Sequence, residues 1–116
     1  MAQTIKKNLF SQALTVTTNN IEALDVTNHV GVSVTVRSPA GGAGSVKLQM
    51  SNIGNSATAT DWTDVPTTIC ATGTLVASGS VTISTIAGIR AAFVRAVVTV
   101  SAGAGNYDIY YVAKEY

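Results

Sequence analysis

Two segments of the chain alternate apolar and polar side chains on either side of a glycine-rich break at residues 38–44. The apolar positions are Val30, Val32, Val34 and Val36 before the break, and Val46, Leu48 and Met50 after it. Consecutive side chains of a β-strand point to opposite faces, so each segment has one face to bury and one to expose. This pattern predicts an all-β fold, an antiparallel β-sandwich or jelly roll, in which residues 30–51 form one long hairpin.

The polar face of the predicted hairpin carries little charge. It consists of Gly31, Ser33, Thr35, Ser45, Gln49 and Ser51, with Arg37 and Lys47 as its only charged residues. The whole chain follows the same trend, since 11% of its residues are charged where about 25% is typical. A monomer needs surface charge for solubility, so we expect part of this surface to be hidden in an assembly. The alternative is a monomer kept soluble by Ser, Thr and Asn.

The length of 116 residues fits a single domain over 1–116. Residues 1–10 are interpreted as an N-terminal arm or strand, and the arm alternative would pair with the sheet edge of a neighbouring subunit. Alternation and turn residues predict further strands, with Asn19 and Asn20 as a turn. For residues 21–26, the strand register that buries Leu24 and Val26 is favoured over the register that would expose them. The predicted strands are 14–18, 21–26, 62–65, 75–77, 80–84, 91–100 and 107–113.

The last two strands are predicted to form a second hairpin with apolar residues on both faces. Such strands lie either in the middle of a sandwich or at a subunit interface. The candidate interface residues are Ile5, Phe10, Phe93, Arg95, Val97, Tyr110 and Val112. The candidate core residues are Val32, Val34, Leu48, Met50, Trp62, Val94 and Val98.

Residues that carry enzyme, metal or nucleic-acid chemistry are sparse. The net charge is +1 and the basic residues are scattered, which argues against nucleic-acid binding. No apolar run is long enough to span a bilayer. The single cysteine, Cys70, excludes an intrachain disulfide and is expected to be a small buried apolar residue. The single histidine, His29, is expected in a surface turn. We therefore expect no catalytic residues, cofactor or metal.

The segment from Ser45 to Asn52, followed by Gly54 and the run Trp62 to Val65, forms a recognisable pattern. It resembles an "LQxSxDGxxWxDV" strand–turn–strand found in small β-sandwich structural proteins of tailed bacteriophages. It is also similar to the equivalent hairpin of discoidin-like carbohydrate-binding jelly rolls. Here Ile53 replaces the usual acidic residue, and residues 56–61 lengthen the loop before Trp62. The likeness covers roughly residues 45–116, including the later Gly-rich turn and Tyr-bearing last strand.

The phage resemblance implies a non-enzymatic virion protein, made in the host cytoplasm. Its expected role is capsid decoration or cementing, through contacts with itself, possibly as a trimer, and with the major capsid or another virion protein. A tail, neck or fibre component and a carbohydrate-binding module are the alternatives. In the sugar-binding alternative Trp62 is a stacking platform, whereas in the structural one it is a core plug. Neither nucleic acid nor membrane is an expected partner.

Overall fold

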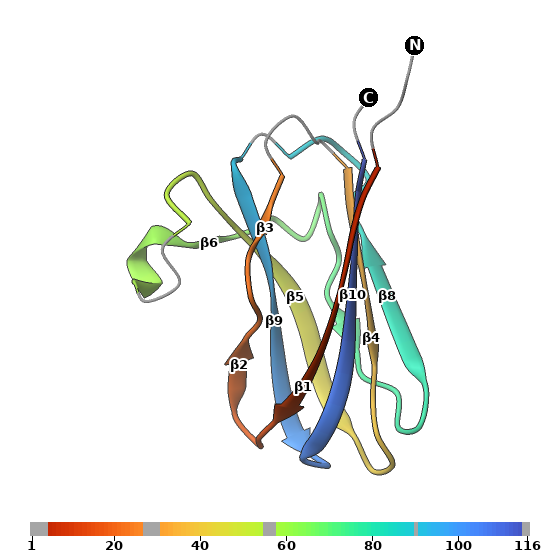
Figure 1. Ribbon diagram of the computed structural model, residues 1–116. Coiled ribbons are helices and arrows are strands. Elements are labelled where there is room, and N and C mark those ends of the chain that lie inside the picture. Colours follow the sequence, from red (N-terminus) through yellow and green to blue (C-terminus); the bar gives the residue numbers. More distant parts are fainter. Residues whose placement is uncertain (1–4, 27–30, 55–57, 90, 115–116) are drawn as a thin grey trace.

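The computed structural model describes residues 5–26, 31–54, 58–89 and 91–114, and for residues 5–8 only the backbone. The chain folds into two antiparallel β-sheets packed face to face, which confirms the predicted sandwich (Figure 1). The jelly-roll connectivity stays a prediction. The first sheet has the order β1 (Ile5–Leu14), β10 (Gly105–Lys114), β4 (Gly31–Arg37) and β8 (Ser80–Ser84).

The second sheet has two long central strands and interrupted edges. Its order is β2 (Thr18–Asn20), β9 (Phe93–Ala102), β5 (Ala43–Ser51) and β6 (Thr63–Asp64). β3 (Leu24–Asp25) also pairs with β9, and β7 (Gly73–Thr74) also pairs with β5. A single 3-10 turn, η1 (Ala59–Asp61), precedes β6. Short edge strands of this kind offer little unpaired backbone to other chains.

The long hairpin predicted over residues 30–51 is wrong, although both of its strands exist. β4 pairs with β10 and β8, whereas β5 pairs with β9, β6 and β7. The segment between them therefore crosses from one sheet to the other. β9 and β10 are joined in the same way, so the second predicted hairpin is also wrong. Alternation fixes which face of a strand is buried, and that face is the same whether the partner lies beside it or across the core.

The two sheet-crossing turns pack against each other at one end of the sandwich (Figure 1). Gly103, in the β9–β10 turn, has φ +76°, and a Cβ there would overlap the backbone of Gly41 and Gly42 in the β4–β5 turn. Only glycine tolerates both this backbone conformation and this close approach. The glycines predicted as turn formers thus allow the two sheet-crossing turns to pack directly against each other.

The N-terminal segment pairs with its own chain. β1 lies antiparallel to β10 from Ile5 opposite Lys114 to Leu14 opposite Gly105, so the arm interpretation is wrong for residues 5–10. The strand predicted over 14–18 is also wrong, because β1 ends at Leu14. The predicted Asn19–Asn20 turn lies in β2. The Asn19 amide instead holds the preceding turn by donating to the carbonyl oxygens of Thr15 and Thr17, both at 3.0 Å.

Other predicted strands agree in part with the observed ones. β8 matches the predicted strand 80–84, while the strand predicted at 75–77 is wrong and β7 lies just before it. Of the segment 21–26 only Leu24–Asp25 is strand. Leu24 and Val26 are buried as expected, but Ile21 is buried as well, because the chain leaves strand geometry after β2. The turn assigned to Thr27, Asn28 and His29 lies outside the described residues.

The core lies between the two sheets and is built from alternate residues of the long strands. Of the candidate core residues, Val32, Val34, Leu48, Val94 and Val98 are buried within it, and Met50 is half-buried at its margin. Tyr107, Ile109 and Tyr111 of β10 face the same interior. Phe10 of β1 meets Tyr111 edge to face, with ring centroids 5.7 Å apart.

Tyr111 connects the two sheets through its hydroxyl group. The backbone N–H of Ala96 in β9 donates to the Tyr111 oxygen at 2.6 Å, and the hydroxyl donates to the backbone oxygen of Glu22 at 3.2 Å. Glu22 lies between β2 and β3, where the edge strand is interrupted. Tyr111 therefore satisfies two backbone groups beside the interruption of the edge strand, where Ile21 still donates its N–H to the Ala96 carbonyl at 2.9 Å. Burial raises the pKa of this phenol, so it remains a neutral donor at ordinary pH.

Replacing Tyr111 by Phe should lower the free energy of unfolding by about 1–3 kcal/mol, because it leaves a buried donor and acceptor unpaired. Urea denaturation of wild type and Tyr111→Phe measures the difference. Tyr110→Phe is the matched control, since the neighbouring Tyr110 is 38% exposed and its replacement should leave the midpoint unchanged. Equal midpoints for Tyr111→Phe and wild type would contradict this role.

Candidate functional site

The outer face of the second sheet contains a buried arginine. Arg95 points outward from β9, between the inward-facing Val94 and Ala96, yet is only 3% exposed. Its Nε donates to Oε1 of Gln49 at 2.9 Å, while its Nη1 has no hydrogen-bond partner among the described residues. Burial lowers the pKa of the guanidinium, and the neighbouring Tyr111 opposes that shift. An arginine nevertheless stays protonated in proteins.

Trp62 provides the cover over Arg95. The guanidinium carbon lies 4.3 Å from the centroid of the indole ring, which is a cation–π arrangement. Trp62 itself is 6% exposed, so its use as a sugar-stacking platform is wrong. It is covered as the core-plug alternative requires, but it packs on an outward-facing arginine rather than between the sheets.

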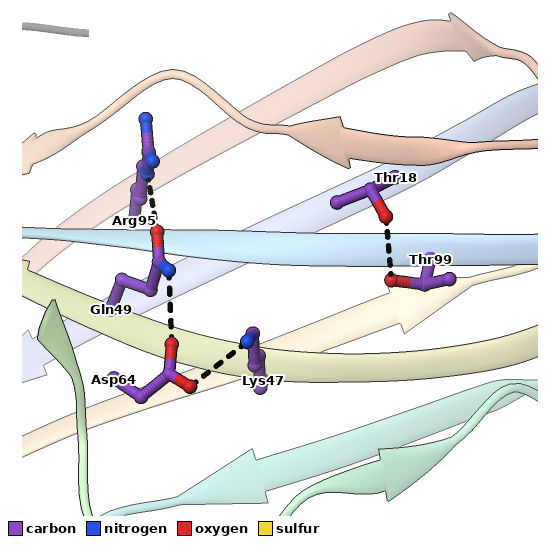
Figure 2. A network of polar contacts seen from close by, with 6 residues as sticks. All are labelled: Thr18, Lys47, Gln49, Asp64, Arg95 and Thr99. Carbon is purple, nitrogen blue, oxygen red and sulfur yellow. Dashed lines mark hydrogen bonds and ion pairs between the residues drawn. The ribbon is translucent and has the colours of Figure 1, made fainter. Parts of the chain in front are cut away.

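A chain of polar contacts continues from Arg95 across this face (Figure 2). Gln49 accepts from Arg95 and donates through Nε2 to Oδ1 of Asp64 at 2.9 Å. Lys47 donates through Nζ to Oδ2 of the same carboxylate at 3.0 Å. The hydrogen bonds from Gln49 and then Lys47 lower the pKa of Asp64 below its ordinary value of 3.8. Because β5 and β6 pair with Gln49 opposite Asp64, these contacts fix the strand–turn–strand that the sequence pattern indicated.

The lowered pKa of Asp64 makes this network sensitive to acid. The unfolded chain binds the proton first, so the stabilisation is present above about pH 4 and is lost as the pH falls through the folded-state pKa. We expect the urea midpoint of wild type to fall more between pH 5 and pH 2.5 than that of Asp64→Asn. Asp61→Asn, which removes a carboxylate from η1, is the control and should retain the wild-type dependence. Parallel curves for wild type and Asp64→Asn would refute the prediction.

A groove opens beside Arg95 where the edge strand is interrupted. It is lined by residues from the β2–β3 segment, from β9 and from the turn after β5, and has a volume of about 710 Å³. Its charged residues are of both signs, and Phe93 adds a half-buried aromatic ring. The lining residues are Asn20, Ile21, Glu22, Ala23, Asp25, Gly54, Phe93 and Arg95.

The outer face of the first sheet is the second candidate surface. One row across its strands joins Leu9, Tyr110, Thr35 and Thr82. Leu9 is 60% exposed and Tyr110 38% exposed, and the hydroxyls of Thr35 and Thr82 lie 2.7 Å apart. We call this row, with its neighbours, the sheet-one face; it comprises Leu9, Ser11, Ser33, Thr35, Arg37, Ser80, Thr82, Ser84, Asp108, Tyr110 and Val112.

Arg37 and Asp108 belong to one cross-strand row of the sheet-one face, and Lys114, exposed at the next outward position of β10 after Val112, adds a positive charge beyond the last row. Ser11 donates to Oδ1 of Asp108 at 2.7 Å, and Nη1 of Arg37 lies 3.8 Å from Oδ2 of the same carboxylate. Both ion-pair partners are substantially exposed, so the pair contributes little to folding stability. It does leave the middle of the face without net charge.

The candidate interface residues are distributed over three different surroundings. Tyr110 and Val112 lie on the sheet-one face, and Ile5 is the first residue of β1 on the same sheet. Phe10 packs inward against Tyr111. On the second sheet, Phe93 lines the groove, but Arg95 and Val97 are covered within the chain itself. Arg95 and Val97 are therefore wrong as protein-contact surface, because side chains of the same domain already shield them; Arg95 keeps only a small exposed part, which borders the groove.

The polar face assigned to residues 31–51 is divided between two surfaces. Ser33 and Thr35 belong to the sheet-one face, whereas Ser45 and Gln49 lie on the outside of the second sheet. The prediction that this segment presents one polar face with little charge is therefore wrong. The crossing of the chain between the sheets separates its halves.

The remaining reactive groups do not gather into a site. Cys70 is buried as expected, and burial raises the pKa of its thiol. In the described ranges, no three His, Cys, Asp or Glu side chains lie close enough together to hold a metal ion. Those ranges also contain no helix long and apolar enough to cross a membrane. His29 lies outside them.

Comparison with known proteins identifies similar folds only. No protein-family model matches the sequence, and no curated protein sequence does either. Among solved structures, the chain is similar to SPBc2 prophage-derived protein YomS, with a TM-score of 0.56, 14% identity, and coverage of 97% of this chain and 96% of YomS. At this identity the similarity shows a shared fold.

Two further structures share this fold. The PBSX exported protein XepA has a TM-score of 0.60 and 15% identity, over 95% of this chain but only 37% of XepA. A protein of the disulfide-linked pili of Bacillus endospore appendages has a TM-score of 0.51 and 15% identity, over 98% of this chain and 89% of that chain. The sandwich described here therefore occurs both as almost an entire chain and as part of a longer one.

Proposed function

We propose that this chain is a non-enzymatic structural protein of a bacteriophage particle, which assembles through its sheet-one face. The observation that carries the proposal is the composition of that face, where Leu9 and Tyr110 are exposed at the centre and Arg37 with Asp108 is the one ion pair among the side chains that the structure describes there. Large exposed apolar side chains surrounded by neutral polar groups are typical of contact surfaces between proteins.

Several polar groups near the centre of this face are already paired with one another. Thr35 lies opposite Thr82 within hydrogen-bonding distance, and Ser11 donates to Asp108. A partner that covers the face therefore need not leave these hydroxyls without hydrogen bonds, which would be costly. The adjacent Arg37 and Asp108 also allow a second copy to offer the opposite charge to each. A second copy of the chain is accordingly the first partner we propose, and a neighbouring virion protein the second.

Fold similarity supports a structural role in a particle. YomS is described as prophage-derived, and another similar structure belongs to pili. Those pili are disulfide-linked, whereas the one cysteine of this chain is buried, so we propose that this chain assembles without covalent links. In decoration or cementing of a capsid, for example as a trimer, the chain would bind only the assembled particle and thereby stabilise it through mass action.

Mass measurements test assembly through the sheet-one face. Light scattering of wild type over a range of concentrations should give multiples of the 11.9 kDa chain. The double variant Leu9→Asp, Tyr110→Asp should weaken association at least about tenfold, which corresponds to 1.4 kcal/mol. Ile86→Asp is the matched control, because Ile86 is 84% exposed but does not belong to this face, and it should associate like wild type.

Binding to the particle is measured separately, by mixing the chain with virions from the same source and locating it in a reconstruction. Density on the capsid supports decoration, whereas density on the tail, neck or fibres supports that alternative role. A chain that stays monomeric and never associates with the particle would overturn the proposed function.

A further inference from the structure

The groove beside Arg95 is a second surface whose chemistry differs from that of the sheet-one face. It lies on the outside of the opposite sheet, where the chain between β2 and β3 leaves the edge of β9. Figure 2 shows Arg95 extending from β9 toward this part of the chain. The groove therefore has a wall of regular strand on one side and an irregular segment on the other.

The charges that line the groove restrict the ligands that it can take. Glu22 and Asp25 are exposed on the irregular side, and the guanidinium of Arg95 lies on the strand side. An anion would meet the two carboxylates, and a cation would meet the guanidinium. A neutral ligand with several hydroxyl groups suits both sides, because a hydroxyl accepts from an arginine and donates to a carboxylate.

The guanidinium is held in place and incompletely bonded. Trp62 covers it at 4.3 Å and Gln49 accepts from its Nε, so its orientation is fixed before any ligand arrives. Its Nη1 is buried and has no hydrogen-bond partner in the described part of the chain. A buried donor without a partner is unusual in a folded protein, and a ligand seated in the groove is one partner that would satisfy it.

An aromatic ring completes the lining. Phe93 is half-buried, and a Cβ on Gly54 would lie 2.6 Å from its Cδ2 atom. The absence of a side chain at Gly54, which has φ +76°, therefore lets the turn after β5 rest directly on the ring. The exposed remainder of the ring offers an apolar surface of the kind against which the C–H face of a sugar ring packs.

We propose that this groove binds a saccharide, with Arg95, Glu22 and Asp25 hydrogen-bonding to its hydroxyl groups and Phe93 packing against a sugar ring. The site uses none of the residues of the sheet-one face, so it does not depend on the proposed assembly. It also differs from the sugar-binding alternative based on Trp62, since Trp62 here supports Arg95 and is itself covered.

The test is a glycan array of neutral and charged saccharides, followed by calorimetric titration with each glycan that binds. Wild type should bind at least one neutral oligosaccharide, with an affinity that changes less than twofold between 50 and 500 mM NaCl. Phe93→Ala and Glu22→Gln should each weaken that binding at least about tenfold. Thermal unfolding of each variant shows whether it is folded, and Glu22→Gln keeps the backbone oxygen to which Tyr111 donates.

Matched controls separate the groove from other surfaces. Tyr110→Ala removes an aromatic ring from the sheet-one face, and Asp61→Asn removes a carboxylate from η1; both should bind the glycan like wild type. Absence of binding across the array would overturn the proposal. Binding only to charged glycans that disappears at 500 mM NaCl, or binding that Phe93→Ala and Glu22→Gln leave unchanged, would also overturn it. None of these results bears on the mass measurements that test assembly.

Discussion

The hydroxyl of Tyr111 is the contact on which the irregular side of the sandwich depends. It reaches from β10 in the first sheet to the N–H of Ala96 and the carbonyl of Glu22 in the second. A buried backbone group without a hydrogen bond is costly. At the interruption between β2 and β3, a side chain from the other sheet therefore supplies hydrogen bonds to two backbone groups of the second sheet.

That interruption has consequences on the outside of the molecule. Where the chain leaves the edge of β9, Glu22 lies between strands, and it borders a groove together with Asp25 of β3. The other wall of the groove contains Arg95 and Phe93. Trp62 covers the guanidinium from the opposite direction, and the Gln49–Asp64–Lys47 contacts hold the β5–β6 pair beneath it. One core hydrogen-bonding group thus determines the shape of a surface site. The opposite sheet has no such break in its described residues, and the middle of its outer face exposes Leu9 and Tyr110 beside the Arg37–Asp108 pair.

The two surfaces suit different partners for physical reasons. On the sheet-one face the hydroxyls of Ser11, Thr35 and Thr82 are already hydrogen-bonded around Leu9 and Tyr110, so covering this part removes apolar area from water at little polar cost. The groove has the opposite character, with charged groups of both signs and an arginine that lacks a partner. A structural protein of a particle that also binds a saccharide would use these two surfaces independently, since they lie on opposite sides of the sandwich.

The sequence by itself determined the all-β fold, the strands β4, β5, β8, β9 and β10 to within a few residues, and most of the core, because alternation reports directly which side chains avoid water. It also indicated the β5–β6 strand–turn–strand around Trp62. Only the tertiary structure decided that residues 31–51 and 93–114 cross between sheets, since a buried face looks the same in a hairpin and in a crossing. It likewise decided that Arg95 and Val97 are covered and that Trp62 packs on an arginine, because long-range contacts leave no periodic trace in the sequence. The groove combines residues from 20 to 95 around a broken edge strand, and no local pattern specifies where such a break will be stabilised from across the core.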